Sequence, residues 1–291
     1  MNYALAWRPA QQMEDIAGQP FDVWRDDDGG ASTMFHRTLA GFLVRFIDGG
    51  DFHIDLACGH VTCTPVPEVS EDYALNLFTN QILPLLWTYD GTPVLHASCV
   101  VIDEKAYGFL GRSGRGKSTL AAAFARFGHA FLTDDGMVIE TDGNGVKVRP
   151  YLASIRLLPD SCSALLGEES VDVDEDDDWA PKARIPASAM IPHAANAAPL
   201  AAIYLLDEPK SDCVTFAPLS VPAGVDALLQ HSFLLDSHDK ARVRTHFRSM
   251  VELAESCPMF ALDYPRDFAR IENTVAAIAA HARANATQRG N

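Results

Sequence analysis

The sequence has no apolar run of the roughly 20 residues that a membrane helix needs, and its start lacks the basic-then-apolar order of a secretory signal. Basic residues are also scarce, with 23 Lys and Arg against 39 Asp and Glu and a formal net charge of −16. A negative surface repels phosphodiester backbones and anionic lipids. We therefore expect a cytoplasmic protein that binds neither nucleic acid nor membranes.

Cysteine is too scattered for a disulfide framework, because the six cysteines follow no paired spacing. We expect reduced thiols. Histidines and cysteines within residues 53–63 could be read as metal ligands, but they lack the Cys-x-x-Cys spacing of zinc modules. The alternation of strand residues explains the same positions equally well, and we favour that interpretation for His53, Cys58, His60 and Cys63.

What the chain does contain is enough apolar surface to fold. Of its 291 residues, 48% are apolar, which can bury one large core or two modest ones. Alternating residues at 42–64 predict short antiparallel strands, and an amphipathic pattern at 70–87 predicts a helix with a kink at Pro84. We expect this β-rich element and helix to span residues 1–90 and to pack on a core of residues 91–291. Within that core, an acidic run near 168–178 is read as a solvated loop.

The pattern that points to chemistry is a β-run, a polar turn, a second β-run, a glycine-rich loop and a helix. The loop fits G-x-x-x-x-G-K-[ST]. Its glycines let backbone N–H groups approach phosphate oxygens, and the start of the helix adds positive dipole character. Lys117 would reach the β- and γ-phosphates, and the Ser118 hydroxyl would coordinate Mg²⁺. We predict that ATP binds at Gly111, Arg112, Ser113, Gly114, Arg115, Gly116, Lys117, Ser118 and Thr119.

Two carboxylate pairs compete for the catalytic role. Asp134 and Asp135 follow the helix and one short strand, so an α/β sheet would return them beside the phosphate site. Asp207 and Glu208 lie in YLLDEP, which resembles the Walker B segment of ABC-transporter ATPases. No LSGGQ-like signature precedes that strand. We therefore favour the first pair and interpret Asp207 as structural.

The segment LHASCVVIDEKAYGFLGRSGRGKSTLAAAFARFGHAFLTDD resembles the catalytic core of HPr kinase/phosphorylase over about forty residues. The resemblance implies a core related to that of phosphoenolpyruvate carboxykinase and transfer of the γ-phosphate of ATP to a protein serine. It also implies residue roles. Asp134 would be the acid/base carboxylate, Asp135 would support it or hold the metal, and His96 would lie beside them.

A weaker resemblance to HPr-kinase-related proteins extends through RPYLASIRLLPD and LDYPRDF. A second HPr-kinase signature, of the Glu-x-Arg-Gly-Leu-Gly type, is absent, which favours a specialised relative and argues against phosphorolysis and HPr itself. One such group phosphorylates the C-terminal serine of lasso-peptide precursors. The acceptor could equally be a protein, and the related enzymes assemble, so a homo-oligomer is an option. Further phosphate or acceptor contacts are expected from Arg156, Lys182 and Arg184.

The sequence thus predicts an α/β fold with an HPr-kinase-like P-loop core and a small N-terminal β-rich element. It predicts an ATP- and Mg²⁺-dependent serine kinase. Two alternatives stay open: a regulatory P-loop NTPase in which Asp134 positions water, and a small-molecule kinase on a carboxykinase-like core.

Overall fold

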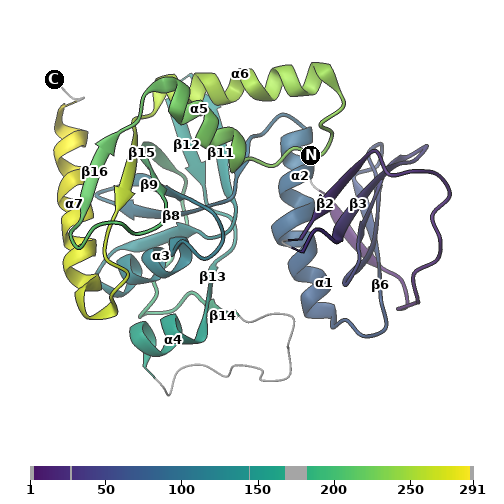
Figure 1. The fold of residues 1–291 in the computed structure, drawn as a ribbon, viewed down its shortest axis with the longest axis horizontal. Coiled ribbons are helices and arrows are strands. Elements are labelled where there is room, and N and C mark those ends of the chain that lie inside the picture. Colours follow the sequence, from purple (N-terminus) through teal and green to yellow (C-terminus); the bar gives the residue numbers. More distant parts are fainter. Residues whose placement is uncertain (1–2, 27, 144, 168–181, 289–291) are drawn as a thin grey trace. The chain divides into compact units, whose positions relative to one another are not determined.

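The computed structural model describes residues 3–26, 28–143, 145–167 and 182–288, and it shows a mixed α/β protein (Figure 1). The acidic run at 168–178 lies outside the described residues. The chain divides into two compact units. One comprises Met1–Gly91 with Leu234–Arg244, and the other comprises Thr92–Phe233 with Thr245–Asn291. None of the described helices is long and apolar enough to cross a membrane.

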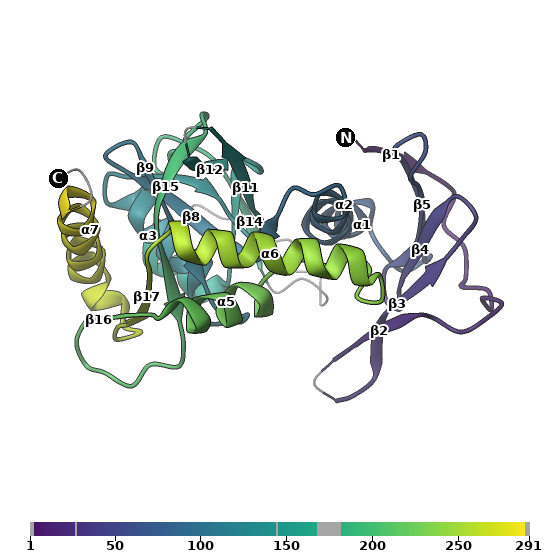
Figure 2. The same ribbon diagram turned by 90° about the horizontal axis from the view of Figure 1, so that it is seen from above.

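The first unit is built on a six-stranded sheet in the order β1-β6-β5-β4-β3-β2, in which only β1 and β6 are parallel (Figure 2). The alternation of the sequence sets its faces, because successive side chains of a strand point to opposite sides. Phe35, Val44 and Phe52 stand in register across three strands and are all buried. The strands are β1 (Ala4–Trp7), β2 (Asp22–Arg25), β3 (Ala31–Arg37), β4 (Gly41–Phe46), β5 (Gly50–Asp55) and β6 (His60–Pro65).

The helical segment of this unit changes its hydrogen-bond pattern partway along. It runs through α1 (Glu71–Leu77), a π-helical turn η1 (Phe78–Ile82) and α2 (Leu83–Tyr89). The Ser70 side chain accepts from the Tyr73 N–H and caps the start. Pro84 has no N–H for the α-helical bond, and its ring crowds the preceding turn. The irregularity that Pro84 predicts therefore takes the form of a π turn directly before it.

The segment Leu234–Arg244 belongs to the first unit because a buried carboxylate fixes it there. Asp236 is only 3% exposed and receives both ends of the Arg37 guanidinium, with an Nη2–Oδ1 distance of 2.9 Å. It also accepts the backbone N–H groups of His238 and Asp239. These bonds hold the pKa of Asp236 below its usual range against the effect of burial.

Replacing Asp236 by Ala is expected to destabilise this unit by about 1–3 kcal/mol, because it removes two backbone caps and the partner of the half-exposed Arg37 guanidinium at once. Asp236→Asn keeps an acceptor for the caps, so its cost should be smaller. Urea unfolding followed by tryptophan fluorescence measures the two costs, since three of the four tryptophans, Trp7, Trp24 and Trp87, belong to this unit. Equal and small changes in both variants would show that the carboxylate does not hold the segment.

The second unit contains the larger, nine-stranded sheet, whose main order is β10-β8-β9-β15-β12-β11-β7. β15 branches the sheet: its start pairs with β12, its end pairs with β17, and β17 carries β16. The strands are β7 (Val94–Leu95), β8 (Ala97–Ile102), β9 (Lys105–Leu110), β10 (Ala130–Thr133), β11 (Met137–Asp142), β12 (Gly145–Arg149), β15 (Ala198–Leu206), β16 (Thr215–Pro218) and β17 (Met259–Asp263). A separate ribbon pairs β13 (Ser154–Leu157) with β14 (Ala183–Pro186).

Helices cover both faces of this sheet. One apolar cluster includes side chains of α3 (Lys117–Arg126), α4 (Pro159–Leu166) and α7 (Ile271–Gln288), and the other includes side chains of α5 (Val221–Gln230) and α6 (Lys240–Ser256). A short 3-10 turn, η2 (Phe268–Arg270), leads into α7. α6 also carries four cations within nine positions, a local basic run that the net charge conceals and that sequence analysis overlooked: Lys240, Arg242, Arg244 and Arg248.

The connection from β9 through α3 to β10 places the chemistry-bearing residues. β8 lies between β9 and β10 and is antiparallel to both, so β9 and β10 run in the same direction. Their carboxyl ends, which carry the glycine-rich loop and the Asp134–Asp135 pair, therefore meet at one edge of the sheet. The beginning of β8, next to His96, lies at the same edge.

Candidate functional site

The glycine-rich loop forms a tight turn between β9 and α3 that only glycine can make at its critical positions. Gly116 has a φ of 90° and caps the start of α3 in the left-handed region. A side chain at Gly111, where φ is 152°, would come within 2.7 Å of the Leu206 carbonyl. The loop can thus press against the end of β15 and expose its N–H groups at the N-terminus of a ten-residue helix.

Lys117 is folded back into the loop. Its side chain is 5% exposed, and Nζ donates to the carbonyl oxygens of Gly111 (2.7 Å) and Arg112 (3.3 Å). Burial lowers the pKa of Lys117 to about 8, against the effect of the nearby Asp135 carboxylate. A buried ammonium that is bonded only to carbonyls is a strong binding group for an anion.

Asp134 and Asp135 lie at the end of β10 in a three-residue turn, in which the Gly136 N–H donates to the Asp134 carbonyl at 2.8 Å. Asp135 has a φ of 59°, a strained conformation for a residue other than glycine. Both carboxylates face Arg156. The backbone N–H of Arg156 donates to Asp134 Oδ2 at 2.9 Å. The guanidinium of the same residue lies 3.6 Å from Asp135 Oδ2. The turn therefore keeps on one side two side chains that a regular strand would separate.

Asp134 carries the clearest electrostatic signature of the site. It is 3% exposed, and burial together with the Asp135 charge raises its pKa to about 6. Three donors oppose this rise: the Arg156 N–H, the Ser98 hydroxyl at 2.5 Å from Oδ1, and the Ser118 hydroxyl. A carboxyl with a pKa close to neutrality, held by the Ser98 hydroxyl and the Arg156 backbone N–H, is suited to take or give a proton.

Two histidines border this group. The backbone N–H of His96 donates to the His231 carbonyl at 2.6 Å. Burial and the charge of Lys117 lower the pKa of each imidazole to about 4, so both rings are neutral at pH 7. Asp135 acts in the opposite direction on His96. The structure thus places His96 beside the carboxylates and adds a second imidazole, His231.

Arg156, Lys182 and Arg184, the three cations predicted to contact phosphate or the acceptor, differ in how closely they approach the glycine-rich loop and the two aspartates. Arg156 contacts both carboxylates, as described above. Arg184 stands opposite Arg156 in the β13–β14 register, and its side chain is exposed. Lys182 is near enough for its charge to lower the pKa values of Lys117 and His96. The β13–β14 ribbon therefore carries positive charge beside the loop.

The remaining residues of the loop have protein partners of their own. Thr119 Oγ1 lies 2.9 Å from Ser161 Oγ, so this hydroxyl links α3 to α4. Arg115 pairs with Glu208 at 2.6 Å. Asp207 is 76% exposed and lies 3.8 Å from Lys210. The pair Asp207–Glu208 thus flanks the outer side of the loop, whereas Asp134–Asp135 lies with Lys117 and Ser118.

Sequence analysis missed four residues that border the loop. Ser98 could have been found, because alternation in a strand places it on the same side as His96. His231, Tyr264 and Arg266 come from distant parts of the chain, and the fold alone brings them here. Tyr264 Oη would lie 2.9 Å from a Cβ on Gly116, and Arg266 Nε would lie 3.8 Å from it.

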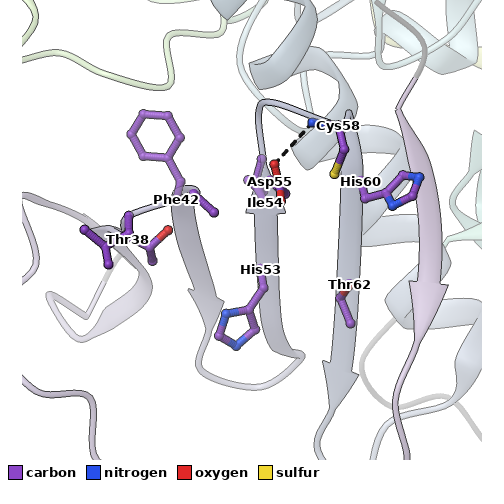
Figure 3. Close-up of a pocket in the computed structure, with 10 residues that line it drawn as sticks. Thr38, Phe42, His53, Ile54, Asp55, Cys58, His60 and Thr62 are labelled. Atoms are coloured by element: carbon purple, nitrogen blue, oxygen red, sulfur yellow. Dashed lines mark hydrogen bonds between the residues drawn. The ribbon is translucent and has the colours of Figure 1, made fainter.

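Three of the four residues considered as metal ligands, His53, Cys58 and His60, line a surface pocket of about 500 Å³ in the first unit. Figure 3 shows His53, Cys58 and His60 on its wall with their side chains apart, and the Cys58 N–H donates to Asp55 at 3.2 Å. Cys63 is buried outside the lining. Within the described residues, no group of three or more His, Cys, Asp or Glu side chains is arranged to hold a metal ion.

Comparisons of the sequence and the fold with known proteins do not establish a family for this chain. No family model and no curated protein matches the chain. A solved structure of the Hpr(Ser) kinase/phosphatase from Coxiella burnetii aligns with 68% of this chain and 99% of its own, at 13% sequence identity and a TM-score of 0.37. A similarity of this size does not establish a family, so the chemistry rests on the residues themselves.

Ser98 has a role that pH dependence can test. Its hydroxyl stabilises the ionised form of Asp134, so Ser98→Ala should raise the pKa of Asp134 further. For a reaction in which Asp134 acts as the base, the rate falls at acidic pH as Asp134 becomes protonated. In Ser98→Ala this fall should occur at a pH about half to one unit higher, with little change in rate above pH 8. Ser98→Thr, which keeps the hydroxyl, should restore the wild-type pH dependence. An unshifted fall in rate in Ser98→Ala would mean that Asp134 does not set it.

Proposed function

We propose that this protein is an ATP- and Mg²⁺-dependent kinase that transfers the γ-phosphate to a serine hydroxyl of a protein or peptide. One observation carries the proposal. Asp134, a buried carboxyl with a pKa raised to about 6, lies close enough to Ser118, at the start of the helix that follows the glycine-rich loop, for the Ser118 hydroxyl to act on that pKa. Phosphoryl transfer needs a loop that positions the triphosphate and a base that takes the proton of the acceptor, and these two parts lie next to each other in the proposed site.

The residues present fit a nucleotide with its metal ion. The loop offers N–H groups and the Lys117 ammonium to the phosphates. Mg²⁺ is usually held by one or two carboxylates together with substrate phosphates, and the Ser118 hydroxyl with Asp135 would provide such a set. When bound, the ion would neutralise charge that develops on the transferred phosphoryl group.

The proton of the acceptor must leave as the new bond forms. The serine oxygen attacks the γ-phosphorus, the bond from that phosphorus to the bridging oxygen of ADP breaks, and Asp134 takes the hydroxyl proton. Ser98 and the Arg156 N–H fix the two oxygens of Asp134, so the base has one orientation. The lowered pKa values of His96 and His231, about 4, make both imidazoles weaker bases than Asp134.

The acceptor is proposed from the sequence resemblance, as a precursor peptide such as a lasso-peptide tail or a small protein. Arg156, Lys182 and Arg184 would bind its phosphate or its chain. A regulatory NTPase would use the same carboxylate to position water. A measurement of ATP turnover with and without host-cell peptides distinguishes the two. A kinase should hydrolyse ATP slowly and form less free phosphate per ADP when an acceptor is added. Fast, acceptor-independent release of phosphate would contradict the proposal.

A further inference from the structure

A second wall of the glycine-rich loop is formed by the residues that follow β17. Tyr264 is 2% exposed, and its ring lies under the Arg266 guanidinium, 3.5 Å from Cζ to the ring centroid. Arg266 also donates from Nη1 to the Tyr264 carbonyl at 2.9 Å and from Nη2 to the Asp207 carbonyl at 3.1 Å. The stack and the two bonds fix the guanidinium in one position.

Both side chains present unused donors to Gly116. The Tyr264 hydroxyl and Arg266 Nε would lie 2.9 and 3.8 Å from a Cβ on this glycine. Within the described residues, neither atom has a hydrogen-bond partner in the protein. The Tyr264 side chain is almost fully buried and its hydroxyl lies next to the glycine-rich loop, so a ligand bound at the loop could supply the partner that this hydroxyl lacks among the described residues.

The charged side chains near Arg266 indicate whether a ligand here would be an anion or a cation. Burial lowers the pKa of Arg266, the Tyr264 hydroxyl and the Asp263 carboxylate act in the opposite direction, and the Arg115 guanidinium adds to the lowering, so a second cation stands near Arg266. Glu208 pairs with Arg115 but not with Arg266. A fixed guanidinium with a free N–H beside another cation is suited to an anion rather than to a neutral group.

We propose that Tyr264 and Arg266 form a polyphosphate-binding arm of the nucleotide site, in which Arg266 Nε and the Tyr264 hydroxyl donate to phosphate oxygens of the bound nucleoside di- or triphosphate. This assignment rests on the proposed function only in that the loop binds a nucleotide. It adds contacts from the residues that follow β17, next to Gly116.

Binding measured by calorimetry separates this arm from other roles. The proteins are wild type, Arg266→Ala, Tyr264→Phe and the matched control Arg270→Ala, whose guanidinium bonds to the Asp212 carbonyl instead. The ligands are adenosine, MgADP and MgATP. Arg266→Ala should weaken MgADP and MgATP roughly tenfold and leave adenosine unchanged. Tyr264→Phe, which loses only a hydroxyl, should weaken both about threefold, and Arg270→Ala should bind as wild type.

The outcomes are separable. If wild type and Arg266→Ala bind both nucleotides equally, the arm is wrong while the proposed function stands. If Arg266→Ala weakens adenosine as much as MgATP, the guanidinium stacks on the base and the polyphosphate assignment is wrong. If wild type binds no nucleotide, both proposals fail. Binding by wild type without transfer to any acceptor contradicts only the kinase. Circular dichroism and Tm of each variant confirm that it is folded.

Discussion

Replacing Lys117 by Ala is expected to abolish measurable MgATP binding, with a loss of affinity of roughly 100-fold or more. The reason is local. Lys117 is the buried cation of the loop, its Nζ is bonded only to two loop carbonyls, and its lowered pKa shows that the protein holds its charge at a cost. Bound phosphates would offset that cost. Calorimetry or equilibrium dialysis with MgATP measures the loss.

The control for this variant is Lys147→Ala. Lys147 pairs at the surface with Asp142 at 2.8 Å and lies on β12, away from the glycine-rich loop along the chain. It should bind MgATP as wild type does. Lys117→Ala removes a buried charge but also the donor to two loop carbonyls, so the measured Tm of the variant is what distinguishes lost binding from unfolding. Normal affinity in folded Lys117→Ala would show that the loop is not a nucleotide site.

Replacing Asp134 by Asn is expected to leave MgATP binding within a few-fold of wild type and to reduce phosphoryl transfer about 1,000-fold. The amide keeps the shape: its oxygen can accept from the Arg156 backbone N–H while its NH₂ group donates to the Ser98 hydroxyl oxygen, but it cannot take the proton. Asp207→Asn is the matched control, because this carboxylate is exposed on the outer flank of the loop. It should transfer phosphate normally. The opposite ranking would assign the base to the second carboxylate pair.

The same variant should be more stable than wild type at neutral pH. The pKa of Asp134 is raised in the folded protein, so the folded state holds this proton more tightly than the unfolded chain. That stabilisation is present at low pH and is lost as the pH rises through about 6. Asn has no charge to bury, so Asp134→Asn should gain about 1–3 kcal/mol at pH 7.5, a few degrees in Tm, and less at pH 5.

Local sequence patterns predicted much of the second unit because its signals are short in range. The run LHASCVVI, the polar turn and AYGFL correspond to the β8–β9 hairpin, in which Asp103 and Glu104 adopt positive φ values. The runs AAIYLL and MFAL lie in β15 and β17. The chain from the glycine-rich loop through α3 also returns to the same sheet edge, as expected for a crossover over one strand.

Contacts between distant parts of the chain could not be predicted in this way. Nothing near Asp236 indicates that its segment returns to the first unit through Arg37, which lies 199 residues earlier. Arg266 reaches the glycine-rich loop only because β17 pairs with β15, next to β9. The strained turn at Asp135 could not be predicted from the sequence either. Two consecutive aspartates at the end of a strand do not by themselves indicate that both side chains lie on the same side of the strand.

The most direct test follows label from γ-labelled ATP in host-cell lysate, with purified wild type, Asp134→Asn and Asp207→Asn in parallel. We expect labelled protein or peptide with wild type and Asp207→Asn but not with Asp134→Asn. Acid hydrolysis of the labelled product should release the label as phosphoserine. Label that appears only as free phosphate, or equal labelling by Asp134→Asn, would contradict the claim that Asp134 is the base of a serine kinase.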